Sequence, residues 1–292
     1  MTKNIFFYMV EGNIGAGKTF FLNTFRDWIT RNQIPNVLFL FEPINIFDYK
    51  FENSDNTTKA LLQLQYENPK RWSALFQNML YLARWKNMCD MSSMILDSSA
   101  QTTFVIMERS MMADRLVFMK KLEAEGNITP LELHMYKLLT SWYNETTFKQ
   151  LYPEATFIWV NINIPNEICF ERTKSRGRKE ENSLTRKHFD EIAYYYEQMF
   201  SSLTNECEYR MMPFTNDYNI VQLLNDVFVE IGQSIYSAHP NNVQKAAAVM
   251  TVTNNPVHEQ VKKDNTNLSY AQVAILKRET AWADEMEKIN PS

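Results

Sequence analysis

The sequence predicts an α/β fold in which a five-stranded parallel sheet carries helices on both faces. Amphipathic stretches alternate with short apolar runs, and this alternation is typical of parallel sheets because each crossover connection lays a helix on the sheet. The apolar runs have the length and composition of strands buried on both sides. They lie at residues 4–10, 37–41, 103–107, 156–162 and 208–213. A glycine-rich turn directly after the first run is the third observation that favours this fold.

The stretches between the strands define the expected helices and the domain boundary. We expect helices near residues 17–32, 57–68, 70–98, 111–125, 129–149, 165–174, 184–202 and 217–236. Residues 1–237 would then form the main domain. Proline and asparagine interrupt the pattern from His239 onward, so residues 238–292 are expected to be a C-terminal extension that is partly disordered or docked. Its candidate helix runs from Ser269 to Lys288.

Composition excludes several classes of protein. Among 292 residues, 45% are hydrophobic and 22% are charged, which fits a globular protein. The net charge of −4 argues against a general binder of nucleic acid or anionic membranes. No apolar run approaches the ~20 residues of a membrane span. Three widely spaced cysteines favour reduced thiols, and no Cys/His cluster suggests zinc, so a cytoplasmic location is expected.

The glycine-rich turn matches the P-loop pattern G-x-x-x-x-G-K-[ST]. It reads Gly12-Asn13-Ile14-Gly15-Ala16-Gly17-Lys18-Thr19, and it holds three of the 6 glycines in the chain. A strand precedes it and a helix follows it, as the motif requires. In such a loop the backbone N–H groups surround phosphate oxygens. Lys18 is expected to reach the β- and γ-phosphates, and the Thr19 hydroxyl is expected to ligate Mg²⁺.

Charged side chains end two other predicted strands, at the sheet edge that also carries the P-loop. Glu42 follows the second strand, and Glu108-Arg109 close the third. Glu108 can lie near Mg²⁺, and Arg109 can bridge the donor phosphate and the acceptor oxygen. Neighbouring residues of a strand point to opposite sides, so each of the two needs its own partner. The plainer alternative is a simple ion pair.

Glu42 also indicates the kind of acceptor. A hydroxyl must lose its proton as phosphoryl transfer proceeds, and a carboxylate can take it. A carboxylate would repel a phosphate acceptor. Glu42 therefore favours an alcohol over a monophosphate, unless it only caps a helix or pairs with a cation.

Two further groups are candidates for binding. Arg172, Arg176 and Arg178 crowd around Gly177 in an acidic chain, as expected for an arginine-rich lid that closes over phosphates. The alternative is a solvated helix end. On the helix near 70–98, Gln77 and Arg84 share one apolar face and could contact a base edge, although an arginine more often extends to water.

Together these motifs resemble the deoxynucleoside kinases related to deoxycytidine and deoxyguanosine kinase. The resemblance covers roughly residues 4–215. It depends on Glu11 through Thr19, on Glu42-Pro43, on Tyr66-Glu67-Asn68-Pro69-Lys70-Arg71-Trp72 with Phe76-Gln77, on Glu108-Arg109-Ser110 through Asp114-Arg115, and on Arg176-Gly177-Arg178-Lys179-Glu180-Glu181. It implies a P-loop kinase fold, and the five motifs in this order are strongly specific.

The resemblance implies a role for each matching residue. Glu42 would activate the 5′-hydroxyl of a deoxynucleoside, Arg109 would lie near that oxygen, and Glu108 would stand on the Mg²⁺ side. Tyr66 and Glu181 would hold the 3′-hydroxyl. The base would bond to Gln77 and stack on Phe118, while Arg172, Arg176 and Arg178 would act from the lid. The remaining residues of the nucleoside pocket would be Phe47, Phe76, Leu80, Arg84 and Asp114.

The resemblance also sets expectations for substrate and partners. Arg84 and Asp114 match a charged pair that favours deoxycytidine or a purine deoxynucleoside over thymidine. Phe47 stands where relatives often have tryptophan, and Leu80 is bulkier than the residue of some relatives, so the pocket is expected to be tighter. ATP or another nucleoside triphosphate, Mg²⁺ and a homodimer are implied.

Two other functions stay open from sequence. A nucleoside monophosphate kinase shares the P-loop and lid, but Glu42 argues against it. A non-catalytic relative would act as a binding subunit, but Lys18, Glu42 and Arg109 are all present. A GTPase is disfavoured because no Asn-Lys-x-Asp motif occurs.

Overall fold

The computed structural model describes residues 4–31, 33–43, 50–52, 58–97, 102–144, 149–153, 155–203 and 209–215. All of them belong to one unit of the chain, residues 1–223. The expected C-terminal extension, the helix expected near 217–236 and Phe47 lie outside the described residues. None of the described helices is long and apolar enough to cross a membrane.

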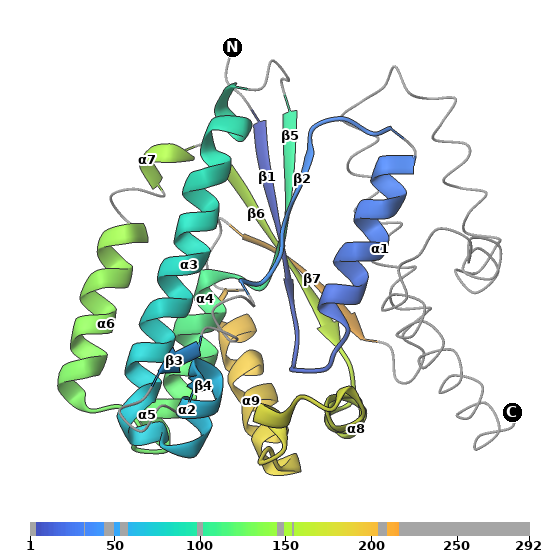
Figure 1. Ribbon diagram of the computed structural model, residues 1–292. Helices are drawn as coiled ribbons and strands as arrows, with labels where there is room; N and C mark the ends of the chain where they lie inside the picture. Colours follow the sequence, from blue (N-terminus) through green and yellow to red (C-terminus); the bar gives the residue numbers. More distant parts are fainter. Residues whose placement is uncertain are drawn as a thin grey trace, which may run out of the picture. The chain divides into compact units, whose positions relative to one another are not determined.

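The main sheet has five parallel strands, as expected (Figure 1). The strand order is β2-β5-β1-β6-β7. The bounds are Asn4–Glu11 for β1, Val37–Leu40 for β2, Thr102–Glu108 for β5, Ala155–Asn163 for β6 and Tyr209–Thr215 for β7. β1 is central, and its register pairs Val10 with Glu108. This pairing brings the P-loop after β1 beside the charged end of β5.

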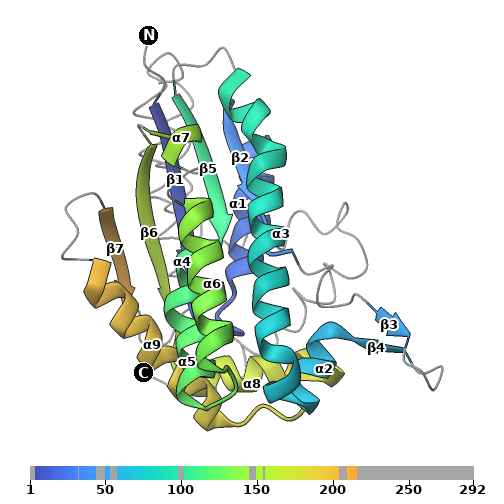
Figure 2. The same cartoon turned by 90° about the vertical axis from the view of Figure 1, so that its left-hand side faces the viewer.

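Helices cover both faces of the sheet. Figures 1 and 2 place α1 on one face and the pair α3 and α6 on the other. The main helices are α1 (Lys18–Arg31), α2 (Leu61–Glu67), α3 (Pro69–Asp97), α6 (Pro130–Trp142), α8 (Asn166–Arg176) and α9 (Arg186–Leu203). Shorter elements are α4 (Met111–Ala113), α5 (Lys120–Ala124), α7 (Lys149–Leu151) and the 3₁₀ turn η4 (Lys179–Glu181).

The core fills the space between the sheet and these helices. On the α1 face, the rings of Phe21, Phe25 and Trp28 stack in sequence along the helix. On the other face, Phe7 and Trp159 of the sheet join a cluster that α3 and α9 complete. The central strands β1 and β5 are therefore buried on both sides. Polar side chains that carry chemistry are left to the carboxyl ends of the strands.

Two expected helices differ from the structure. Residues 57–68 do not form one helix: β4 (Thr58–Ala60) pairs in antiparallel fashion with β3 (Lys50–Glu52), and α2 begins only at Leu61. Ala60 at its N-cap has extended backbone angles, φ −69 and ψ 147. Residues 111–125 are helical, but a π-helical segment, η2 (Asp114–Met119), separates α4 from α5. Such wide turns often occur at functional sites.

Candidate active site

The P-loop has the backbone of a phosphate-binding loop. Gly12 has a φ of 145, and a Cβ there would lie 2.6 Å from the carbonyl oxygen of Ile162. No other residue type fits this position without displacing β6. Gly15 and Gly17 also have positive φ. The loop joins β1 to α1, the context that its motif requires, with Ile14 and Ala16 between the glycines. The Asn13 amide donates to the carbonyl oxygen of Phe189 at 2.9 Å.

Lys18 is buried and folds back over the loop. Its Nζ donates to the carbonyl oxygens of Gly12 at 3.0 Å and Asn13 at 2.7 Å. Burial, together with the Arg109 guanidinium, lowers the pKa of Lys18 to about 7, against the pull of nearby glutamates. A bound phosphate would supply the negative charge that stabilises the ammonium form.

Thr19 and Glu108, the two residues expected at the metal, lie together. The Thr19 hydroxyl donates to Oε1 of Glu108 at 2.6 Å, and the backbone N–H of Glu42 lies 3.4 Å from Oε2. These oxygens fit a hard cation. The described residues contain no cluster of three or more metal-ligating side chains. Such a sparse donor set fits Mg²⁺, which usually takes its remaining ligands from phosphate and water.

Glu42 is at the centre of a buried charge cluster. Its Oε1 accepts a hydrogen bond from Nη2 of Arg84 at 2.6 Å and lies 3.3 Å from Nε of Arg109. Arg84 also places Nε 2.8 Å from Oδ2 of Asp114 and donates Nη1 to the backbone carbonyl of Glu108 at 3.0 Å. The arginine is 2% exposed, so it does not extend to water. The expected partners at the acceptor side are therefore brought together.

Burial and charge act in opposite directions on these carboxyl groups. For Glu42, the effect of Arg109, Arg84 and Lys18 exceeds that of burial and lowers the pKa to about 2. For Asp114, burial exceeds the effect of Arg84 and Arg109 and raises the pKa to about 6. At neutral pH the two carboxylates and two guanidinium groups balance in charge.

Gln77 lies on the same helix face as Arg84, as its spacing predicts. Its side chain is 3% exposed, and among the described residues Oε1 has no hydrogen-bond partner. A buried acceptor without a partner is costly, and a ligand could supply the missing donor. Phe76 and Leu80 are buried beside it. Phe118, on η2, presents its ring face to the Arg109 guanidinium at 4.6 Å.

The arginine segment, residues 172–178, contacts Glu181, one of the two residues expected at the sugar. Nη2 of Arg176 lies 2.8 Å from both carboxylate oxygens of Glu181, and Nη1 of Arg178 lies 3.5 Å from one of them. Burial and Glu181 both raise the pKa of Tyr66. Arg172 is half-buried one turn earlier on α8.

Two residues of this site, Glu11 and Tyr196, were not identified as functional from the sequence. Glu11 is fully buried and accepts a hydrogen bond from the backbone of Ser110 at 2.6 Å and from the Tyr196 hydroxyl at 3.1 Å. The signal for Glu11 was present, because it is a charge at the end of a buried strand. Tyr196 gave no such signal, since it lies among other tyrosines on an amphipathic helix.

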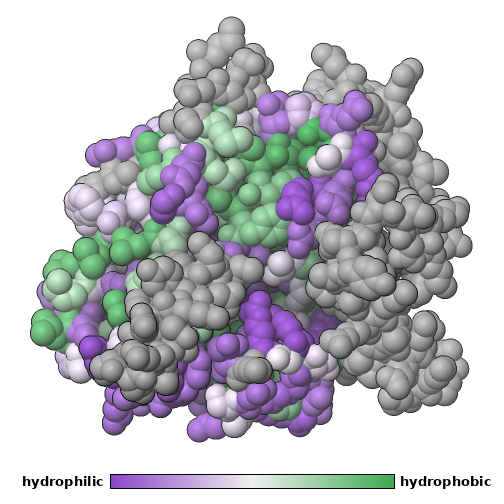
Figure 3. Space-filling model, viewed as in Figure 1, coloured by the Kyte–Doolittle hydropathy of each residue, from purple (hydrophilic) through white to green (hydrophobic). Residues whose placement is uncertain are grey.

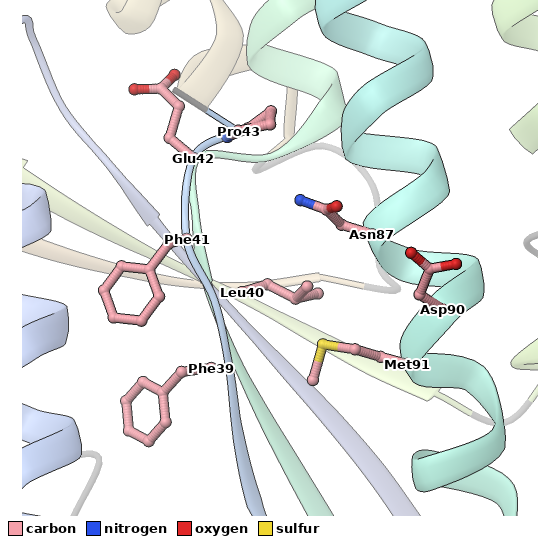
Figure 4. A pocket seen from close by; sticks show the side chains of 8 residues that line it. All are labelled: Phe39, Leu40, Phe41, Glu42, Pro43, Asn87, Asp90 and Met91. Atoms are coloured by element: carbon pink, nitrogen blue, oxygen red, sulfur yellow. The ribbon is translucent and has the colours of Figure 1, made fainter. Parts of the chain in front are cut away.

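A cavity of about 390 Å³ lies beside the site, between the end of β2 and α3 (Figure 4). It is lined by Phe39, Leu40, Phe41, Glu42, Pro43, Asn87, Asp90 and Met91. Figure 4 shows the Glu42 carboxylate pointing away from Asn87 and Met91. Among the described residues predicted for the acceptor side, Glu42 alone lines this cavity.

Comparison with known proteins identifies the family. The family model described as deoxynucleoside kinase matches residues 8–235. The chain belongs to the deoxynucleoside kinase family. It is therefore an enzyme, a kinase of nucleotide salvage, as the motifs implied.

The relatives agree with this assignment. A deoxyguanosine kinase described as mitochondrial, from Xenopus laevis, is 30% identical over 234 residues, which cover 75% of this chain and 80% of that protein. A human deoxycytidine kinase is 26% identical over 196 residues, or 64% and 72% of the two chains. A solved deoxyadenosine kinase from M. mycoides with bound dCTP is similar in fold, with a TM-score of 0.54 at 16% identity over 78% of this chain and 99% of that one.

Proposed function

We propose that this kinase transfers the γ-phosphate of ATP, with Mg²⁺, to the 5′-hydroxyl of a deoxynucleoside. The observation that carries the proposal is Glu42, an ionised and half-buried carboxylate just after β2, beside Arg109 and the P-loop. A monophosphate acceptor would bring its own negative charge against this carboxylate. An uncharged hydroxyl would instead find a group able to take its proton.

On the donor side, the loop amides and Lys18 would hold the phosphates. Thr19 and Glu108 would hold Mg²⁺, which neutralises charge on the phosphate oxygens when bound. Arg172, Arg176 and Arg178 would approach the transferring phosphoryl group from the lid. Arg109 would stabilise charge between donor and acceptor oxygens, since electrostatic stabilisation is the main contribution to this reaction.

On the acceptor side, Glu42 would orient the 5′-hydroxyl and accept its proton. A pKa of about 2 makes Glu42 a weak base in the free enzyme. Proton transfer would therefore accompany phosphoryl transfer, as the hydroxyl becomes more acidic. Tyr66 and Glu181 would bind the 3′-hydroxyl, in exchange for the contacts of Glu181 with the lid arginines.

The base would lie between Gln77 and Phe118, with Phe47, Phe76 and Leu80 completing the pocket. We infer a preference for deoxycytidine or a purine deoxynucleoside over thymidine. The support is the buried ion pair of Arg84 and Asp114, which offers both donors and acceptors to an amino-bearing base edge. An apolar methyl group would meet desolvated charge there.

Steady-state assays with ATP and Mg²⁺ test these assignments. The panel contains the four deoxynucleosides, the four monophosphates and a second triphosphate donor, with the inactive variant Lys18→Ala as control. We expect the largest kcat/KM for deoxycytidine or a purine deoxynucleoside. A dominant kcat/KM for thymidine would overturn the base preference. Activity only on monophosphates would favour a monophosphate kinase, and no activity at all would favour a non-catalytic subunit.

We also propose a homodimer. Five large apolar side chains of α6 are exposed: Leu131, Met135, Leu138, Leu139 and Trp142. The side chain of Trp142 is 57% exposed. Figure 3 shows hydrophobic residues gathered on the side of the molecule where α6 lies. An apolar face of this kind marks an interaction site. Leu138→Asp should shift the sedimentation coefficient from dimer to monomer, whereas Tyr194→Asp, at an exposed residue of α9, should not.

The cytoplasm is the location we propose, and no nucleic acid or membrane is a proposed partner. The net charge of −4 supports the absence of these two partners, because nucleic acids and anionic membranes attract chains with an excess of basic residues. One relative carries the word mitochondrial in its name. Cell fractionation with the tagged full chain distinguishes the two compartments.

A further inference from the structure

A buried chain of hydrogen bonds reaches Arg109 at Nη1, whereas Glu42 faces its Nε. The backbone N–H of Ser110 and the Tyr196 hydroxyl both donate to the carboxylate of Glu11, at 2.6 and 3.1 Å. Nη1 of Arg109 is hydrogen-bonded to the same Tyr196 hydroxyl. All four residues are at most 5% exposed, so water does not compete for these contacts.

The chemistry of the groups fixes the direction of this chain. A guanidinium only donates, and the single proton of the Tyr196 hydroxyl is directed to Oε2 of Glu11. The Tyr196 hydroxyl must therefore accept from Arg109 and use its single proton toward Glu11. Hydrogen bonds to charged partners are about twice as strong as neutral ones. Tyr196 makes one such bond to Arg109 and a second hydrogen bond to the Glu11 carboxyl group, so its oxygen is held between these two residues.

Arg109 needs such support for two reasons. Its φ is 65, a left-handed backbone conformation that costs free energy in a residue with a side chain. Its ion-pair partner is Glu42, at 3.3 Å, and Glu42 must also serve the acceptor hydroxyl under the proposed function. A contact shared with the substrate cannot define the guanidinium position throughout the reaction. Tyr196 contacts a different guanidinium nitrogen, and its hydroxyl is not shared with the substrate under this function.

Tyr196 also connects parts of the chain that are far apart in sequence. It belongs to α9, the helix that follows the arginine segment 172–178. The same helix contacts the P-loop through the Phe189 carbonyl, which accepts from Asn13, and Glu11 immediately precedes that loop. α9 thus contacts the start of the P-loop on either side of Gly12, and Arg109 is hydrogen-bonded to α9.

We propose that Tyr196, oriented by Glu11, is a positioning residue that fixes the guanidinium of Arg109 for phosphoryl transfer. The proposal rests on the proposed function, because it assigns a support to an arginine of that reaction. Tyr196 does not reach the substrate. Its hydroxyl acts through Arg109, while its ring packs edge-on against Phe118 with centroids 6.5 Å apart. α9 therefore contributes to the geometry of the acceptor side.

Tyr196→Phe tests the proposal with little change in packing. The ring remains stacked on Phe200, with centroids 6.0 Å apart, and only the hydroxyl is lost. We expect kcat to fall about tenfold, which corresponds to about 1.4 kcal/mol, while KM for the deoxynucleoside changes less than threefold. The matched control is Tyr81→Phe, which removes a buried hydroxyl bonded to Asn144 at 3.0 Å. It should lose similar thermal stability and keep its kcat.

Glu11→Gln tests the same chain from its other end, and it leaves the tyrosine in place. We expect its kcat to fall as well, and the double variant Glu11→Gln/Tyr196→Phe to be less impaired than the product of the two single effects. A kcat for Tyr196→Phe within twofold of the parent enzyme would overturn the positioning role and leave the proposed function intact. An enzyme inactive on every deoxynucleoside would overturn both.

Discussion

Gln77 illustrates how stability and function oppose each other at a single residue. Its buried Oε1 lacks a partner among the described residues, so without a ligand this oxygen costs the folded protein stability. Residues of this kind mark sites where a protein has retained chemistry at a cost in stability.

Gln77→Leu should separate the two effects. We expect the free energy of unfolding in urea to stay the same or rise by up to about 1 kcal/mol, because an unpaired polar group leaves the core. The kcat/KM for the preferred deoxynucleoside should fall about 100-fold, because the base then loses its partner. The control is Gln63→Leu on α2, a glutamine whose amide only reaches Glu67. A loss of stability without a loss of kcat/KM would remove Gln77 from the base site.

Glu42 gives a second prediction at this scale. Glu42→Gln keeps the shape of the side chain but cannot take a proton, so kcat should fall by ~10²-fold or more, the range of general base catalysis. Binding of ATP, measured by titration calorimetry, should persist. Glu67→Gln, at an exposed glutamate of α2, should leave kcat unchanged. Near-normal turnover of Glu42→Gln would assign the carboxylate to support of Arg84 and Arg109 alone.

Residue chemistry made much of the site predictable from sequence. The P-loop has a fixed pattern, and the charges of Glu42, Glu108 and Arg109 end apolar strands where burial makes charge costly. Each of the neighbours Glu108 and Arg109 has its own partner, as strand geometry requires. Tyr196 could not be found in this way, because its role depends on a contact across 87 residues of sequence.

At the scale of elements, the P-loop depends on glycine more strictly than an ordinary turn does. Gly12 combines a φ of 145 with a Cβ position that overlaps the backbone of β6. Gly126 has a φ of 67, and nothing lies within 4 Å of its Cβ position. A side chain at Gly126 would therefore meet backbone strain alone, whereas one at Gly12 would meet both backbone strain and steric overlap.

Gly126→Ala should cost about 1 kcal/mol of unfolding free energy, from backbone conformation alone. Gly12→Ala should cost about 2 to 4 kcal/mol, because overpacking against β6 adds to the strain. Urea denaturation of both variants measures the difference, and ATP binding should be lost only in Gly12→Ala. Equal destabilisation would mean that the loop can move away from β6.

Element existence was predictable, whereas element detail was not. Alternating apolar and amphipathic stretches are sufficient for strands such as β5 and helices such as α3. The antiparallel strands β3 and β4 are only three residues long each, and strands this short give no periodic pattern in the sequence. The segment η2 has the same apolar periodicity as an α-helix, so its wider turn could not be recognised.

At the scale of the whole molecule, His188 couples folding to pH. Burial, together with Lys121, lowers the pKa of His188 to about 4 from its ordinary value of 6.5, against the effect of Glu191. Between these two values the unfolded chain binds a proton that the folded protein does not. The free energy of unfolding therefore falls as pH falls from 6.5 to 4.

This contribution is at most about 3 kcal/mol, from the size of the shift. His188→Gln should flatten the acid limb of a plot of unfolding free energy against pH, measured in urea at each pH from 7 to 4. His134→Gln, at an exposed residue of α6, serves as the control variant. An acid limb as steep in His188→Gln as in the parent enzyme would assign the pH dependence to other groups.

The number of residues in the π-helical segment η2 determines how Asp114 and Phe118 are placed in the pocket. Asp114 begins it, and Phe118 lies within it. A helix advances by about 100° per residue, so losing one residue here would rotate everything before or after it by that angle. Either Asp114 would leave Arg84 or Phe118 would leave Arg109. As the family diverges, point substitutions in η2 can therefore be tolerated. Insertion or deletion of a single residue would instead disrupt the contacts of the acceptor side in one step.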